Sequence, residues 1–165
     1  MTGFNKLKTL EFAPNNIIKD FIFINVYIIY YKLSSIKFTL IEKIANIFKK
    51  YNISIEHIPT GIDSISIVVS NDDVEKYKYE ILTELKNDLK ADTVSVQENI
   101  SLIAIVGRNM AGHVGLSGLL FSVLGSSDIN VKMIAQGPEE LNIVLGIDSK
   151  DYSRTIKLIY DRLVK

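Results

Sequence analysis

The sequence predicts an α+β fold made of two successive βαββαβ units, each with its helices on one face of a sheet. An internal repeat is the first observation behind this prediction, because residues 52–68 align without a gap with residues 128–144 and place Gly61 over Gly137. The second observation is that both copies contain two short β-branched strands around a glycine-containing turn, which is typical of a hairpin. A chain of 165 residues is long enough for two such domains.

The elements of the first unit follow in order within residues 17–98. An apolar strand is expected at 21–29, and the helix after it has apolar residues at helical spacing. These residues are Leu40, Ile44, Ile47 and Phe48. After the hairpin, the Asn-Asp-Asp run at 71–73 is suited to cap a second helix, and a strand at 93–97 closes the unit.

The second unit repeats this order but lacks a closing strand. It begins with a strand at 100–106, and its last helix is expected to open at the Asp-Ser pair 148–149. Between the two lie the hairpin and a helix whose apolar residues again recur at helical spacing. These residues are Leu116, Leu120, Val123 and Leu124.

A spare strand at 7–12 supplies the missing partner. We expect it to complete the second sheet, because proteins normally avoid an unpaired sheet edge. The first unit, 17–98, is then inserted into a second unit formed by 5–14 and 99–165. An orphan strand at this position also implies a preceding domain. The alternative is that the N-terminal segment is a frayed arm.

Composition and charge exclude several classes of function. The chain has 19 Lys and Arg residues against 19 Asp and Glu residues, which removes the electrostatic reason to expect nucleic acid or an anionic membrane. The absence of cysteine excludes disulfides, thiolate catalysis and cysteine zinc sites, and His57 and His113 are too few for a histidine-rich metal site. We therefore expect no catalytic residues, no metal and no cofactor. The apolar stretch 21–31 is too short to span a membrane and lacks a signal cleavage site, so we expect a buried strand in a cytoplasmic protein.

The segment 107–115 is a candidate binding loop between a strand and a helix. Its glycine spacing and the lack of a Lys-Ser/Thr pair exclude a Walker-type phosphate loop. Backbone amides and the positive end of the helix dipole can instead hold one carboxylate there. The alternative is a flexible surface loop.

Other candidate residues favour structural roles. Glu56 and His57 are neighbours on a predicted strand and point to opposite faces, so they are not expected to form an acid–base pair. RNA-binding domains share the βαββαβ order, but they need basic charge and stacked strand aromatics that this chain lacks. A group of tyrosines is expected mostly in the core or at an interface: Tyr27, Tyr30, Tyr31, Tyr51, Tyr77 and Tyr79.

Three segments carry a resemblance to a known family. The string Glu-His-Ile-Pro-Thr-Gly-Ile-Asp at 56–63, the strand and loop at 103–112, and Gln136-Gly137 followed by Glu-Leu-Asn-Ile at 140–143 together resemble the C-terminal regulatory region of bacterial aspartokinases. That region is a tandem of ferredoxin-like ACT domains with one unit inserted in the other. The resemblance covers nearly the whole chain and implies a regulatory segment without a kinase domain, which is not an enzyme by itself.

The resemblance also implies a ligand and a partner. In this family an end-product amino acid, lysine or threonine, binds at ACT interfaces between two chains and shifts the kinase toward an inactive arrangement, so a homodimer and an upstream kinase domain are expected. The effector-binding positions that it implies in the first unit are Ser34, Ser35, Thr39, Leu40, Ile41, Ser54, Glu56, Gly61, Ile62 and Asp63. Those that it implies in the second unit are Met110, Gly115, Leu116, Gln136, Asn142 and Ile143.

Three positions depart from the family pattern. Thr39-Leu40 stands where family members usually have Gly-Phe, and the Thr39 Cβ crowds a backbone-lined carboxylate site and disfavours a positive φ. Ala135 stands where a serine is usual and removes a hydroxyl. Two functions remain open: the regulatory segment of an aspartokinase, and a free-standing tandem ACT sensor or dimerisation scaffold.

Overall fold

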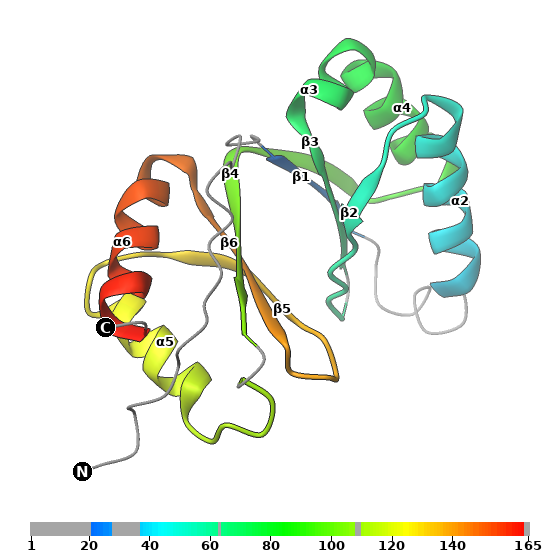
Figure 1. Cartoon of the computed structure of the whole chain (residues 1–165). Coiled ribbons are helices and arrows are strands. Elements are labelled where there is room, and N and C mark those ends of the chain that lie inside the picture. Colours follow the sequence, from blue (N-terminus) through cyan, green and yellow to red (C-terminus); the bar gives the residue numbers. More distant parts are fainter. Residues whose placement is uncertain (1–20, 28–36, 63, 108–109, 164–165) are drawn as a thin grey trace. The chain divides into compact units, whose positions relative to one another are not determined.

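The structure of the protein is a computed structural model (Figure 1), and it describes residues 21–27, 37–62, 64–107 and 110–163. The described residues fall into two compact units, one ending at Ile100 and the other beginning at Ser101. No helix in this part of the chain is long and apolar enough to cross a bilayer.

The first unit has the predicted order of elements. They are β1 (Phe21–Tyr27), α2 (Lys37–Lys50), β2 (Ile55–His57), β3 (Ser64–Ser70), α3 (Asn71–Val74), η1 (Glu75–Tyr77), α4 (Lys78–Asp88) and the start of β4 (Thr93–Val106). The strands lie in the order β2-β3-β1-β4, and β1 pairs antiparallel with both β3 and β4. Each helical connection therefore joins two strands that are not neighbours, as a βαββαβ unit requires, and the predicted fold class is confirmed.

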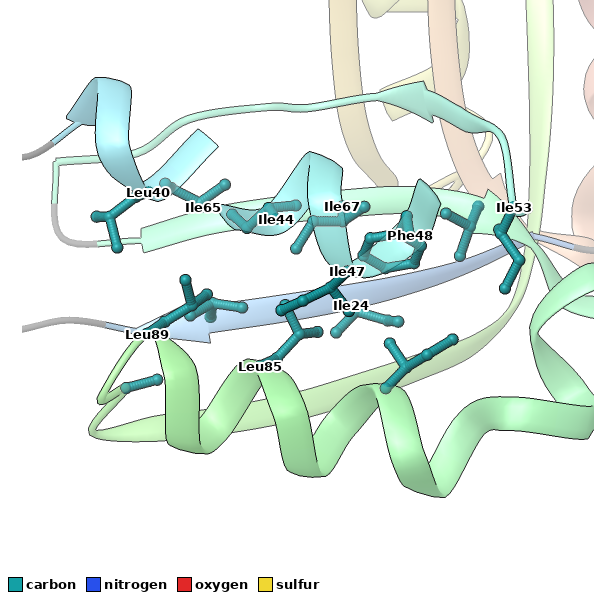
Figure 2. Close-up of a cluster of buried hydrophobic side chains, with 14 of the residues drawn as sticks. Ile24, Leu40, Ile44, Ile47, Phe48, Ile53, Ile65, Ile67, Leu85 and Leu89 are labelled. Carbon is teal, nitrogen blue, oxygen red and sulfur yellow. The ribbon is translucent and has the colours of Figure 1, made fainter. Parts of the chain in front are cut away.

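One face of this sheet is buried beneath α2 and α4 (Figure 2). Figure 2 shows Ile24 of β1 and Ile67 of β3 between residues of the two helices, among them Phe48 and Leu85. All four apolar residues predicted for the first helix lie in this core, and Phe48 is 1% exposed. Burial of a side chain of this size contributes roughly 1.5–3 kcal/mol, so this apolar stripe fixes α2 on the sheet.

The second unit is built in the same way. It contains the rest of β4, followed by α5 (Leu116–Gly125), β5 (Val131–Gln136), β6 (Asn142–Asp148), η2 (Ser149–Asp151) and α6 (Tyr152–Leu163). The strands lie in the order β4-β6-β5, and Leu116, Leu120 and Leu124 of α5 join a second core with residues of α6 and the strands. The strand expected at 7–12 lies outside the described residues, so its place in this sheet stays a prediction.

β4 differs from the expectation of two separate strands at 93–97 and 100–106. It is one strand from Thr93 to Val106. Its pairing with β1 shifts register, since Phe21 lies opposite Ile100 but Phe23 lies opposite Gln97. The extra residue on β4 makes a β-bulge, and Asn99 takes a φ of 56° there. The polar Glu-Asn pair interrupts the apolar pattern without ending the strand.

The sequence repeat is also visible in how two helices end. After α2, Asn52 takes a φ of 55° and Ile53 N–H donates to the Phe48 carbonyl at 3.0 Å. After α5, Asp128 takes a φ of 54° and Ile129 N–H donates to the Leu124 carbonyl at 3.0 Å. Both are Schellman-type ends, in which a left-handed residue turns the chain from the helix into the next strand.

Of the two predicted helix caps, the one at Asp148 is confirmed in position and the one at 71–73 lies one residue too late. Ser70, rather than the Asn-Asp-Asp run, takes the N-cap position before α3, and its side chain makes no capping hydrogen bond. Asp148 does take the N-cap position before η2, but its carboxylate accepts from Lys132 Nζ at 2.5 Å instead of capping. A cross-strand cation therefore outcompetes the local backbone amides for this carboxylate.

The tyrosines divide between two environments. Tyr51 and Tyr77 are half-buried with ring centroids 5.0 Å apart, as expected for residues beside a core. Tyr79 is 81% exposed, so it is not a core residue. Tyr30 and Tyr31 lie outside the described residues.

A carboxylate joins α2 to α4 on the outer surface of the first unit. Glu84 Oε1 accepts from Lys50 Nζ and from Tyr51 Oη, each at 2.6 Å. The hydrogen bond from Lys50, and after it that from Tyr51, lowers the pKa of the Glu84 carboxyl. Since the folded state favours the ionised form, this contact stabilises the fold at neutral pH and is lost as the pH falls through the lowered pKa.

The left-handed helix ends give a first testable prediction. Asn52→Ala should lower the free energy of unfolding by about 1 kcal/mol relative to Asn52→Gly, because the alanine Cβ disfavours the positive φ that glycine adopts freely. Asp128→Ala and Asp128→Gly should repeat this difference in the second unit. Urea denaturation of the four variants measures it, and equal stability of the Ala and Gly variants at both positions would contradict it.

The Glu84 contact gives a second prediction. As the pH falls through the lowered pKa of Glu84, the free energy of unfolding should fall less steeply in Glu84→Gln than in wild type. The difference should be small because Lys50 is 60% exposed. Chemical denaturation at each pH measures the profile. Glu42→Gln, which removes an exposed glutamate from α2, is the matched control and should keep the wild-type slope.

Candidate functional site

The candidate site is a pocket of about 350 Å³ within the second unit. It lies where the loop between β4 and α5 faces the turn end of the β5–β6 hairpin. Its lining residues are Met110, Gly112, His113, Val114, Leu116, Ser117, Gln136, Glu140 and Ile143.

Successive turns shape the loop wall of the pocket. Gly107 N–H donates to the Leu141 carbonyl at 3.1 Å and so joins the end of β4 to the hairpin. Met110 N–H then donates to the Gly107 carbonyl, and His113 N–H donates to the Met110 carbonyl. Gly115 has a φ of 91°, which explains a glycine directly before α5.

The first turn of α5 contains backbone donors that have no acceptor within the helix. Gly115 occupies the N-cap position and no side chain caps the helix. The first intrahelical bond runs from Leu119 N–H to the Gly115 carbonyl, so the preceding amides of Ser117 and Gly118 have no acceptor within the helix. These donors and the helix dipole make this edge of the pocket electropositive.

The hairpin supplies the opposite wall. Gln136 lies opposite Ile143 in the ladder, so the two share one face. Glu140, in the turn, has a φ of 55°, and its N–H donates to the Gly137 carbonyl at 3.0 Å. The Glu140 carboxylate crosses the pocket, because its Oε2 accepts from Gly112 N–H at 2.8 Å.

The pocket therefore has an apolar floor and a polar rim. Met110, Leu116 and Ile143 form the floor and are 4%, 6% and 1% exposed, respectively. His113, Ser117, Gln136 and Glu140 provide the polar groups. The described residues hold no cluster of acidic and histidine side chains that could bind a metal ion. Such an arrangement suits reversible binding of a small molecule that has both an apolar and a charged part.

Of the six positions predicted in the second unit, the pocket brings four together. Met110, Leu116, Gln136 and Ile143 line it, while Gly115 and Asn142 flank it without lining it. The lining residues that the prediction missed are Gly112, His113, Val114, Ser117 and Glu140. The first three belong to the loop singled out in the sequence, and Glu140 lies in the Gln-Gly string, so the signal was present for four of the five.

The positions predicted in the first unit are placed only in part. Ser34, Ser35 and Asp63 lie outside the described residues. Leu40 is packed in the first core and is 5% exposed. The other positions are exposed: Thr39, Ile41, Ser54, Glu56, Gly61 and Ile62. A first-unit pocket stays a prediction.

Two of these positions show what the local backbone permits. Thr39 lies inside α2, so the positive φ considered for it does not arise, and only its Cβ remains as a difference from glycine. Gly61 N–H donates to the Ser64 carbonyl at 2.8 Å, and a Cβ at Gly61 would lie 2.6 Å from Ser64 Oγ. A side chain at position 61 would therefore force the Ser64 hydroxyl to rotate away, while the next atom, the Ser64 carbonyl oxygen at 3.6 Å, is at ordinary contact distance.

Described residues of the first unit also line two hollows, in which polar groups contact each other. One, of about 370 Å³, lies between α2 and α4, where Lys43 Nζ donates to the Asp88 carbonyl and Lys50 pairs with Glu84. The second, of about 420 Å³, lies beside α4 and β4, where Lys86 Nζ donates to the Asp92 carbonyl. Because these cations already have partners, we place the candidate site in the second unit.

Comparison with known proteins agrees with this geometry. Residues 103–163 match the ACT domain family. An aspartokinase of Candida albicans is 32% identical over 117 residues, covering 70% of this chain and 21% of that protein. Aspartokinase 3 of Bacillus subtilis is 26% identical over 115 residues, covering 69% of this chain and 25% of that protein. The chain thus spans about a quarter of the length of the curated relatives it matches.

Solved structures extend the likeness to both units. Aspartate kinase of Clostridium acetobutylicum superposes with a TM-score of 0.82 at 29% identity, covering 88% of this chain and 33% of that one. The ligand-free regulatory subunit of Thermus thermophilus aspartate kinase shares the fold with a TM-score of 0.68 at 15% identity. The match covers 88% of this chain and 93% of that one. Escherichia coli aspartokinase III, in complex with lysine and aspartate, shares it with a TM-score of 0.69 at 18% identity, covering 94% and 35%. The chain is an ACT-domain region of the aspartokinase family.

Proposed function

We propose that this chain senses an amino acid for an aspartokinase, and that lysine or threonine is the effector that lowers the activity of a linked kinase domain. The observation that carries the proposal is the pocket of about 350 Å³ between the β4–α5 loop and the hairpin. Support for the effector class comes from the lysine and aspartate complex of a protein with this fold.

The chemistry of the pocket is consistent with an amino acid. The N–H groups at the start of α5 can donate to an α-carboxylate, and the buried floor of Met110, Leu116 and Ile143 can take an aliphatic side chain. Such a ligand regulates only if it binds one of two states of the protein more tightly. We therefore propose that the effector favours the state in which the kinase domain is inactive.

The organisation of the chain forms part of this proposal. We propose that residues 17–98 are inserted in a second unit made of residues 5–14 and 99–165, and that two copies of the chain associate through their ACT units in the cytoplasm. Support for the boundary at 98–99 comes from the division of the described residues between Ile100 and Ser101.

A titration of the isolated chain tests the effector. Lysine, threonine, methionine and meso-diaminopimelate are added one at a time, and thermal unfolding is followed. We expect one of them to raise the melting temperature in proportion to its occupancy, since a ligand at 100 times its Kd stabilises the folded state by about 2.7 kcal/mol.

Two matched variants locate the binding. Gln136→Ala removes a rim amide and should weaken the shift severalfold. Asn130→Ala removes an exposed amide just before β5, away from the pocket, and should leave the shift unchanged. A shift of equal size in both variants would place the binding elsewhere. The absence of a shift with all four amino acids would favour a dimerisation scaffold.

A further inference from the structure

The Glu140 carboxylate is held across the mouth of the pocket by one of its two oxygens. Oε2 accepts from Gly112 N–H at 2.8 Å, and this contact joins the hairpin turn to the loop. No contact with another described residue engages Oε1. Because the carboxylate is fixed at one oxygen, its charge is held at the pocket rim without a further loss of side-chain freedom on binding.

Glu140 also determines the sign of the charge at this rim. It is the one carboxylate among the described lining residues, and no described lysine or arginine lines the pocket. Its neighbour Glu139 is exposed and does not line the pocket. The pocket therefore has a positive edge at the amides of α5 and a negative edge at Glu140.

We propose that Glu140 binds the ammonium group of the ligand and restricts the pocket to ligands that carry a positive charge. The inference rests on the proposed function and adds to it the residue that selects the charge. A hydrogen-bonded ammonium–carboxylate pair is stronger than a neutral hydrogen bond. A ligand without a cationic group would remove water from the Glu140 carboxylate and supply no opposite charge in its place. Compounds of the same size that carry no cationic group are excluded on this basis.

Isothermal titration of three proteins tests this role: wild type, Glu140→Gln and Glu139→Gln. The glutamine amide oxygen at position 140 can still accept from Gly112 N–H, so Glu140→Gln removes the charge and keeps the link between the walls. Glu139→Gln makes the same change in net charge one residue away. With the amino acid that binds wild type, we expect Glu140→Gln to raise the Kd about tenfold and Glu139→Gln to change it less than twofold.

Ligand analogues without the cation complete the test. The Nα-acetyl derivative of the bound amino acid, and norleucine in place of lysine, each remove one ammonium group. At least one analogue should bind wild type about tenfold more weakly, and Glu140→Gln should remove that difference. Glu140→Asp, which keeps the charge on a shorter side chain, should fall between wild type and Glu140→Gln.

The outcomes separate the two proposals. If wild type binds an amino acid but Glu140→Gln binds it as well as Glu139→Gln does, the role of Glu140 is wrong and the proposed function stands. Tighter binding by Glu140→Gln would also overturn the role, because the carboxylate would then compete with the ligand. If wild type binds none of the amino acids, the proposed function fails and the role of Glu140 fails with it.

Discussion

Burial of one sheet face under a pair of helices is the constraint on which both units depend. In the first unit, Ile24 and Ile67 meet the apolar stripe of α2, and in the second unit α5 and α6 cover β4 and β6 in the same way. Because each helix must return the chain to a strand beside the sheet, the strand-to-helix loop and the hairpin turn lie at the same end of a unit. The pocket of the second unit is formed at that end.

The pocket floor belongs to the same core that holds the second unit together. Met110, Leu116 and Ile143 are members of the second core and also line the pocket. A ligand that packs on these side chains therefore adds contacts to the core itself. Occupancy of the site and stability of the unit are linked for this reason, and such a link is what a sensor needs in order to report binding to a neighbouring domain.

Local patterns predicted much of the fold, because they depend on neighbours in the sequence. The spacing of Leu40, Ile44, Ile47 and Phe48 predicted a helix and its buried face, and both are present. The conformation at Asn99 and the contact of Asp148 were not predicted, because each depends on a strand that is distant in the sequence. The bulge at Asn99 lies where β4 pairs with β1, and Lys132 donates a hydrogen bond to the carboxylate of Asp148. At the site, family resemblance supplied four lining residues, while the contact of Glu140 with Gly112 depends on the folded loop and could not be seen in the sequence.

The backbone at Glu140 reveals a trade-off between stability and recognition. A non-glycine residue with a φ of 55° is strained by roughly 1 kcal/mol or more, and a glycine in the turn would relieve that strain. Glycine would also delete the carboxylate that crosses the pocket. The turn is thus less stable than a glycine turn at the position whose charged side chain contacts the loop. A screen of this chain for thermostable variants would select glycine at position 140. The variants that it selects would discriminate less well between ligands, because they lack the Glu140 carboxylate.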